Sequence, residues 1–197
     1  MHRTFVRWTL AAAWLWGVVV AGVAGAAAQD ASTPGGAGGD LSLSLTQGSW
    51  LVEAFGAAGV GDGDGSLYTG HLSVTWFFAD GLGVAAQPFA GYIDGEFDDT
   101  AVAGLDVLLR WFPVREKSWA LFLEGGSGAH YAFPDSFPDG GSHFNFRPMA
   151  GLGVLAQLGP VTASAGARYL HISNGNITQP NQGWDGFLLH AGLAIPF

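Results

Sequence analysis

Hydrophobic and polar side chains alternate with a period of two along most of the chain after residue 48. This is the period of a β-strand, in which successive side chains point to opposite faces of the sheet. Each alternating segment runs for about ten to thirteen residues and ends at a turn signal rich in Gly, Asp and Pro. The pattern predicts eight strands, over residues 49–60, 68–79, 83–93, 100–112, 119–130, 143–158, 161–173 and 184–196.

The two faces of the predicted strands differ strongly in polarity. One face is aliphatic and aromatic, as Phe144, Leu152 and Val154 show for one strand. The opposite face collects acids and arginines, namely Glu53, Asp106, Arg110, Glu124, Arg147 and Arg168. These opposite charges can neutralise one another inside a narrow lumen that side chains fill. An apolar exterior around a polar interior is the pattern of a transmembrane β-barrel.

Strand length and strand number indicate the same fold class, an all-β, eight-stranded antiparallel transmembrane β-barrel. Such a barrel has short periplasmic turns and longer external loops. With this topology four tryptophans fall near periplasmic strand ends: Trp50, Trp76, Trp111 and Trp119. Phe197 ends the last strand, where outer-membrane barrels commonly carry an aromatic residue. The alternative is a secreted β-sandwich, whose interior the apolar faces could form.

The N-terminal residues do not fit the strand pattern. Arg3 and Arg7 form a basic start, residues 8–24 are almost wholly apolar, and small alanines follow. This layout predicts a secretory signal peptide, with an uncleaved transmembrane anchor as the alternative. The next segment is small, polar and Gly-rich, which predicts a flexible lead-in. The predicted domains are therefore signal peptide, lead-in and barrel, over residues 1–28, 29–48 and 49–197.

Composition and charge narrow the range of functions. The chain carries a net charge of −9, and the predicted signal peptide contains arginines but no acidic residue, so its cleavage would make the protein more acidic. Such an acidic protein is a poor partner for nucleic acid. The absence of cysteine excludes disulfides, thiol catalysis and Cys-based metal binding. Acidic residues of the predicted external loops could bind divalent cations, but we interpret them as solvated charges and predict no metal site.

A polar stretch near the C-terminus holds candidate catalytic residues. His171 and Ser173 lie two residues apart at the end of one predicted strand, and Asp185 begins the next. Strand alternation places all three on the lipid-facing side, and the even separation of His171 and Asp185 lets them pair across a hairpin. A serine nucleophile needs a base, and a histidine base needs an acid to orient it. The alternative is an ordinary hairpin rim, where Asn, Ser and Gly only form a turn.

The sequence HISN at residues 171–174, followed by QPNQGWD at 179–185, resembles the PagL family of outer-membrane lipid A 3-O-deacylases. That family consists of eight-stranded barrels with a Ser-His-Glu triad that faces the outer leaflet. The resemblance implies that Ser173 is the nucleophile, His171 the base and Asp185 the residue at the acid position.

The resemblance also implies roles in oxyanion binding or substrate positioning for Asn174 and Asn181, together with the backbone around Gly175. Two features depart from the family pattern. Asp185 stands where the family usually has Glu, which is one methylene longer. Gly175 follows the asparagine directly, as SNGN, one residue earlier than in the family.

The function implied by the resemblance is that of a serine esterase without a cofactor. It would hydrolyse the ester-linked 3-hydroxyacyl chain at position 3 of lipid A, with lipopolysaccharide as its substrate. It would be a multi-pass protein of the Gram-negative outer membrane, with its active site facing the outer leaflet. The alternative is a non-catalytic barrel, either an adhesin or a membrane-stabilising protein. Side chains fill eight-stranded barrels, which argues against a pore, and a homodimer is an open alternative.

Overall fold

In the computed structural model the chain divides into two units, Met1–Leu41 and Ser42–Phe197. The structure describes residues 45–62, 65–95, 99–138, 141–159, 161–181 and 183–196, all within the second unit. The predicted signal peptide, most of the predicted lead-in and the terminal phenylalanine lie outside the described residues. In the described ranges no helix is long and apolar enough to cross a membrane.

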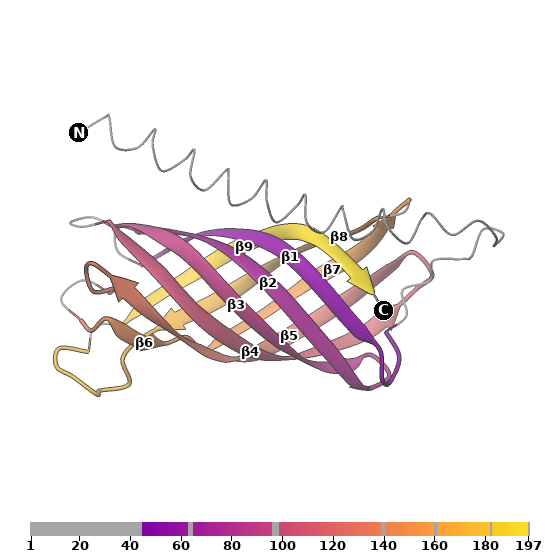
Figure 1. Cartoon of the computed structure of the whole chain (residues 1–197), viewed down its shortest axis with the longest axis horizontal. Helices are drawn as coiled ribbons and strands as arrows, with labels where there is room; N and C mark the ends of the chain where they lie inside the picture. The colour runs from indigo at the N-terminus through magenta and orange to yellow at the C-terminus, as the bar shows by residue number, and fades with distance from the viewer. Residues whose placement is uncertain are drawn as a thin grey trace. The chain divides into compact units, whose positions relative to one another are not determined.

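The described residues form one antiparallel sheet that closes on itself (Figure 1). Its strands are β1 (Trp50–Gly61), β2 (Gly65–Ala79), β3 (Leu82–Gly95), β4 (Thr100–Arg115), β5 (Trp119–Phe133), β6 (Phe144–Phe146), β7 (Met149–Leu158), β8 (Val161–Ile172) and β9 (Trp184–Pro196). Consecutive strands pair with each other except for β6 and β7, which both pair with β5, and β1 pairs with β9, which closes the barrel.

The short strand β6 and the strand β7 are two parts of one barrel strand. Both pair with β5 in a single register, in which Ala129 lies opposite Phe146 and Gly126 opposite Met149. Pro148 lies between them, and a proline lacks the N–H that a continuous ladder needs. The barrel therefore has eight strands, which confirms the predicted fold class, although the sixth predicted strand is interrupted.

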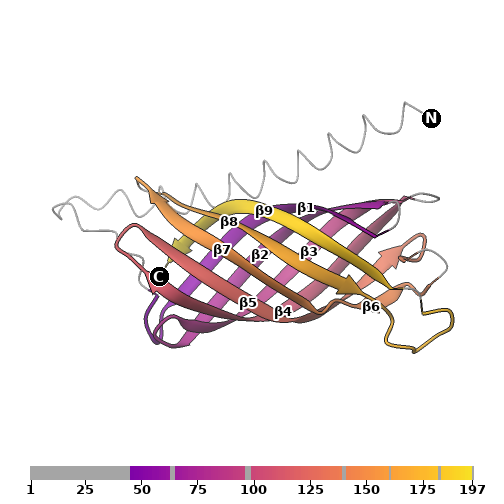
Figure 2. The same ribbon diagram turned by 180° about the vertical axis from the view of Figure 1, so that it is seen from behind.

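The two ends of the barrel differ in their connections (Figures 1 and 2). The end that carries the connections β1–β2, β3–β4, β5–β6 and β8–β9 is called the loop end, and the opposite end the turn end. At the turn end only Asp80 and Gly81 connect β2 to β3. The alternation of short and long connections is as predicted, but β2, β4 and β5 extend beyond their predicted bounds because ladder pairing continues past the alternating pattern.

Tryptophan side chains surround the turn end on its outer face. Trp50, Trp76, Trp111 and Trp119 are all exposed near this end. The rings of Trp50 and Trp76 lie 6.4 Å apart across β1 and β2. Indole rings favour the interface between membrane and water, so this arrangement is that of an aromatic girdle.

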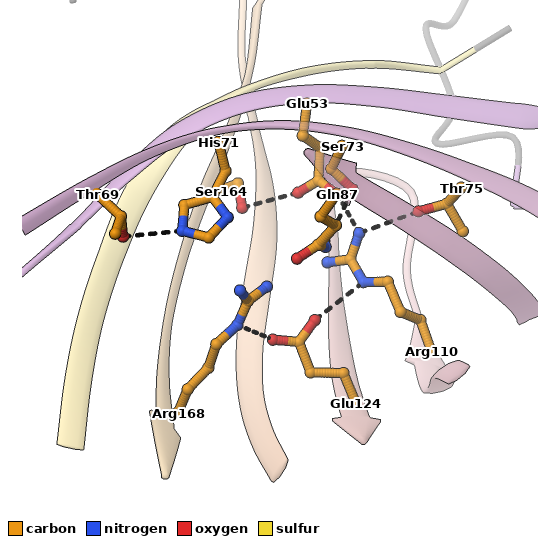
Figure 3. Close-up of polar contacts among 10 residues, drawn as sticks. All are labelled: Glu53, Thr69, His71, Ser73, Thr75, Gln87, Arg110, Glu124, Ser164 and Arg168. Carbon is orange, nitrogen blue, oxygen red and sulfur yellow. Dashed lines mark hydrogen bonds and ion pairs between the residues drawn. The ribbon is translucent and has the colours of Figure 1, made fainter. Parts of the chain in front are cut away.

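Opposite charges meet in the middle of the lumen (Figure 3). Arg110 forms an ion pair with Glu53, and its Nε lies 3.3 Å from Glu124 Oε2. Arg168 Nε lies 2.5 Å from the other oxygen of Glu124. Ser164 donates a hydrogen bond of 3.0 Å to Glu53. Each acid therefore has a cationic partner, which a charge in a low-dielectric interior requires.

A further ion pair lies in the same lumen. Arg147 Nε is 3.7 Å from Asp106 Oδ1, and the Arg147 guanidinium lies 3.8 Å from the centre of the Phe89 ring. His71 and His190 are also buried inside the barrel. The inward positions predicted for the charged residues are thus confirmed.

Apolar layers lie on both sides of this charged layer, so the predicted polar interior is correct only for the middle of the barrel. Toward the turn end the layer consists of Leu45, Leu51, Phe77, Phe112, Ala120, Phe122, Leu155 and Ala194. Toward the loop end it includes Leu67, Ile93, Val102, Leu170, Ile172 and Trp184. These side chains fill the lumen and separate the ion pairs from water.

The end of the predicted flexible lead-in belongs to this packing. Leu45 is only 1% exposed, and the Gly81 N–H donates to the Leu45 carbonyl at 2.8 Å. Gly48 in turn donates its N–H to the Phe77 carbonyl at 2.8 Å. Residues 45–48 are therefore held against the turn end.

Candidate active site

The β8–β9 hairpin carries the candidate residues to the loop end of the barrel, where β8 lies beside β6 (Figure 2). Its register pairs His171 with Asp185. Leu170 and Ile172 are buried in the lumen, so the residues that alternate with them face outward. Ser173 follows the end of β8 with the same parity. The predicted outward placement of all three residues is what the structure has.

Hydrogen bonds connect the three side chains in a row. His171 Nδ1 lies 2.9 Å from Asp185 Oδ1, and His171 Nε2 lies 3.1 Å from Ser173 Oγ. The His171 and Asp185 side chains are 36% and 38% exposed, so the site is open to the surroundings of the barrel. With the Nδ1 proton donated to Asp185, Nε2 is left to accept the Ser173 hydroxyl proton.

The strand β6 holds the backbone of the serine in place. The Ser173 N–H donates to the Phe146 carbonyl at 3.2 Å, and the Phe146 N–H donates to the Ser173 carbonyl at 2.8 Å. Further along, the His171 N–H donates to the Pro148 carbonyl at 3.0 Å. Ser173 and His171 are thus fixed by a neighbouring strand that is far from them in the sequence.

Two more residues contact the acid. The Tyr169 hydroxyl donates to Asp185 Oδ1, the same oxygen that faces His171. Asp62, directly after β1, accepts the Asp185 N–H through Oδ1 at 2.6 Å and donates its own N–H to the Asp185 carbonyl at 2.8 Å. Two hydrogen bonds to the carboxylate favour its ionised form.

The β8–β9 loop is held together by asparagine side chains. Asn174 is buried, with its amide nitrogen 3.1 Å from the Thr178 carbonyl and its amide oxygen 2.9 Å from the Asn176 N–H. Asn181 Oδ1 accepts the Asn174 N–H at 2.9 Å. The Asn174 and Asn181 side chains, predicted to take part in oxyanion binding or substrate positioning, are bonded within the loop and shape its backbone beside Ser173.

Two glycines of the β8–β9 loop leave room for the side chains of Phe146 and His171. Gly175 has a φ of +63°, and a Cβ there would lie 3.4 Å from the Phe146 ring. A Cβ at Gly183 would lie 3.0 Å from His171 Cε1, closer than side chains ordinarily pack. Gly183 therefore keeps free the space that the imidazole occupies.

Sequence reasoning found the three residues in the hydrogen-bonded row but missed Tyr169, Asp62 and Gly183. The parity of β8 could have found Tyr169, which lies two residues before His171 on the same face. No sequence pattern indicates Asp62, because its contact depends on the closure of the barrel by β1 and β9. In the part of the chain that the structure describes, no group of three His, Asp or Glu side chains could hold a metal ion.

Comparison with known proteins places the chain in a family. The model of the family described as Lipid A 3-O-deacylase (PagL) matches residues 66–194, which include every residue of the hydrogen-bonded row. A comparison with curated proteins gives no match.

Solved structures show the same fold. The crystal structure of the outer membrane enzyme PagL matches with a TM-score of 0.58 and 24% identity, over 74% of this chain and 99% of that one. The outer membrane protein OprG from Pseudomonas aeruginosa has a TM-score of 0.52 and 16% identity, over 77% and 97% of the two chains. Neisserial surface protein A has a TM-score of 0.57 and 16% identity, over 77% of this chain and 98% of that one. With the family match over most of its length, this outer-membrane β-barrel belongs to the PagL family of lipid A 3-O-deacylases, which are esterases.

Proposed function

We propose that Ser173 is the nucleophile of this lipid A 3-O-deacylase, that His171 is its general base, and that Asp185 orients and stabilises the base. The observation that carries the proposal is the unbroken row of hydrogen bonds from the Asp185 carboxylate through both His171 nitrogens to the Ser173 hydroxyl. Family membership supplies the substrate class, an ester-linked acyl chain of lipid A.

In the first half-reaction the Ser173 hydroxyl transfers its proton to His171 Nε2 while Oγ attacks the ester carbonyl carbon. The carbonyl electrons move to its oxygen, and the Asp185 carboxylate stabilises the imidazolium through Nδ1. When the intermediate collapses, the ester C–O bond to the sugar breaks. His171 returns the proton to the leaving sugar oxygen, which departs as a hydroxyl group, and the acyl chain stays on Ser173.

In the second half-reaction water replaces the sugar hydroxyl. His171 Nε2 takes one proton from the water as its oxygen attacks the acyl carbon. The bond to Ser173 Oγ then breaks, and Nε2 returns the proton to the serine. The product is a free 3-hydroxy fatty acid.

The oxyanion needs hydrogen-bond donors close to the nucleophile. Among the described residues no group accepts the backbone N–H of Gly175, two positions after Ser173. Asn174 and Asn181 hold this part of the loop through their own hydrogen bonds. We assign the oxyanion contact to the Gly175 backbone and a positioning role to the two asparagines.

The outward position of the row fits a substrate that lies in the membrane. A lipid in the outer leaflet would reach Ser173 from the side and would not have to enter the filled lumen. This requires that the loop end faces the cell exterior, as long loops do in outer-membrane barrels. One copy of the chain contains all three residues, so the proposed reaction needs no contribution from a second copy.

The test is mass spectrometry of lipid A from cells that produce the native protein or Ser173→Ala. We expect the native protein to remove one ester-linked 3-hydroxyacyl chain and the variant to remove none. Ser127→Ala is the matched control, since Ser127 is another exposed serine of the barrel wall, on β5. Removal of the acyl chain by a folded Ser173→Ala variant would show that another group is the nucleophile.

A further inference from the structure

The Tyr169 hydroxyl lies beside the proposed triad and is not part of it. It donates a hydrogen bond to Asp185 Oδ1, and the same oxygen lies 2.9 Å from His171 Nδ1. The carboxylate therefore receives two donors on one oxygen. Tyr169 touches neither His171 Nε2 nor Ser173 through any hydrogen bond of the described residues.

The tyrosine ring is itself held in position. Tyr169 lies opposite Phe187 in the register of β8 and β9, and the two rings meet edge to face with centroids 5.4 Å apart. The next outward pair in the ladder is His171 and Asp185. The ring thus approaches the carboxylate from the middle of the barrel wall, which is the side of the lipid tails, while His171 lies directly across the ladder from it.

The lipid-facing position of Asp185 explains why the contact with Tyr169 matters. An ionised carboxylate on the lipid-facing side needs donors to replace those of water. An aspartate also has a freely rotating terminal group, so a single bond to His171 leaves its orientation undetermined. A phenol that donates to Oδ1 fixes the rotation and keeps the oxygen in line with Nδ1.

We propose that Tyr169 is a positioning residue of the deacylase, which acts on catalysis through the orientation of Asp185. This inference rests on the proposed function, because it assigns Asp185 as the acid of the triad. It predicts that the hydroxyl matters for turnover and not for lipid binding, and that it has no effect once the carboxylate is absent.

The test is a double-mutant cycle with Tyr169→Phe and Asp185→Ala, assayed on purified lipid A in detergent micelles. Tyr169→Phe keeps the ring and its contact with Phe187. We expect it to lower kcat about tenfold, the order expected for one hydrogen bond to a charged group, with KM within about twofold of wild type. In the Asp185→Ala background the same change should have no further effect.

A second measurement is independent of turnover. A fluorophosphonate reacts with an activated serine, so the rate of labelling of Ser173, followed by intact-protein mass, reports its activation alone. We expect Tyr169→Phe to slow labelling by the same factor as kcat. Tyr68→Phe is the matched control, because Tyr68 is an exposed, outward-facing tyrosine of β2, and it should behave as wild type.

The outcomes separate the two levels of the proposal. Wild-type rates for Tyr169→Phe, or an equal loss with and without the Asp185 carboxylate, would overturn the inference and leave the triad intact. An active Asp185→Ala beside an inactive Ser173→Ala would remove the acid from the mechanism and the role of Tyr169 with it. An active Ser173→Ala would reject the proposed function itself.

Discussion

Asp185 has a short side chain, so the position of its backbone decides whether the carboxylate reaches the imidazole. The backbone of Asp185 is held on both sides, by His171 across the β8–β9 ladder and by Asp62 beyond the end of β1. Its carboxylate is held by Tyr169. The short acid therefore lies at hydrogen-bond distance from His171 because these contacts hold it there, and a one-methylene difference from Glu does not break the row.

At the same scale, Gly183 leaves room for the imidazole of His171, the proposed base. A methyl group at this residue would lie 3.0 Å from His171 Cε1, so the imidazole would have to move by a few tenths of an ångström. We expect Gly183→Ala to lower kcat about three- to tenfold, because catalysis depends steeply on the placement of the reacting groups. Initial rates of lipid A deacylation in detergent micelles measure the effect.

Gly70→Ala is the control for this substitution. Gly70 lies on β2, and a Cβ there has no atom within 4 Å, so activity should stay at the wild-type level. Unchanged activity of Gly183→Ala would mean that the imidazole tolerates the shift or that the loop moves instead.

At the scale of elements, the strands could be predicted because lipid outside and charges inside impose opposite polarity on alternate residues. Leu105, Val107 and Leu109 face outward and Asp106 and Arg110 inward, as the period of two predicts. Pro148 is a sequence signal for the interruption, since a proline cannot donate to the ladder. The extra length of β4 and β5 could not be predicted, since it depends on pairing with neighbouring strands. The apolar layers of the lumen were missed because apolar residues occur on both faces near strand ends.

The candidate site, too, could be predicted from the sequence only in part. The row of Ser173, His171 and Asp185 follows from parity and hairpin register, which are local properties of β8 and β9. The contacts of Asn174 and Asn181 follow from the folded loop, whose backbone includes two consecutive residues with positive φ, Gly175 and Asn176. A sequence shows that such residues are present, but not which way their amides turn.

The contact between β1 and β9 gives a prediction for a whole element. Asp62 accepts the Asp185 N–H at the point where the two strands separate, so it fixes the start of β9. We expect Asp62→Ala to lower kcat about three- to tenfold by loosening the acid, whereas Asp62→Asn, which keeps an acceptor oxygen, should retain most of the activity. Deacylation rates of the two variants, with the barrel shown to be folded, make the comparison.

Equal losses in Asp62→Ala and Asp62→Asn would attribute the effect to the charge of Asp62 and not to its hydrogen bond. Equal wild-type activity would show that the ladder alone holds Asp185. Either result leaves the assignment of the triad untouched, because Asp62 contacts only the backbone of the acid.

At the scale of the whole barrel, the structure separates stability from catalysis. The proposed triad lies on the outer face at the loop end, whereas the ion pairs lie in the middle of the lumen between two apolar layers. Replacement of a triad residue removes few packing contacts and should leave the barrel folded. Replacement of a lumen charge should lower the stability of the barrel and leave the activity of each folded molecule unchanged.

Glu124 provides the test of this separation. Its two oxygens face Arg110 and Arg168, so Glu124→Gln keeps the shape of the side chain but leaves two buried arginines with less compensating charge. Breaking a buried ion pair costs about 3–5 kcal/mol, and we expect the free energy of unfolding to fall by about this amount. Urea titration in detergent, followed by tryptophan fluorescence, measures this free energy.

Glu116→Gln in the exposed turn between β4 and β5 is the control and should change the urea midpoint little. At low urea the folded Glu124→Gln barrel should deacylate lipid A at the wild-type rate; a loss of rate per folded molecule would show that the lumen and the outer site are coupled.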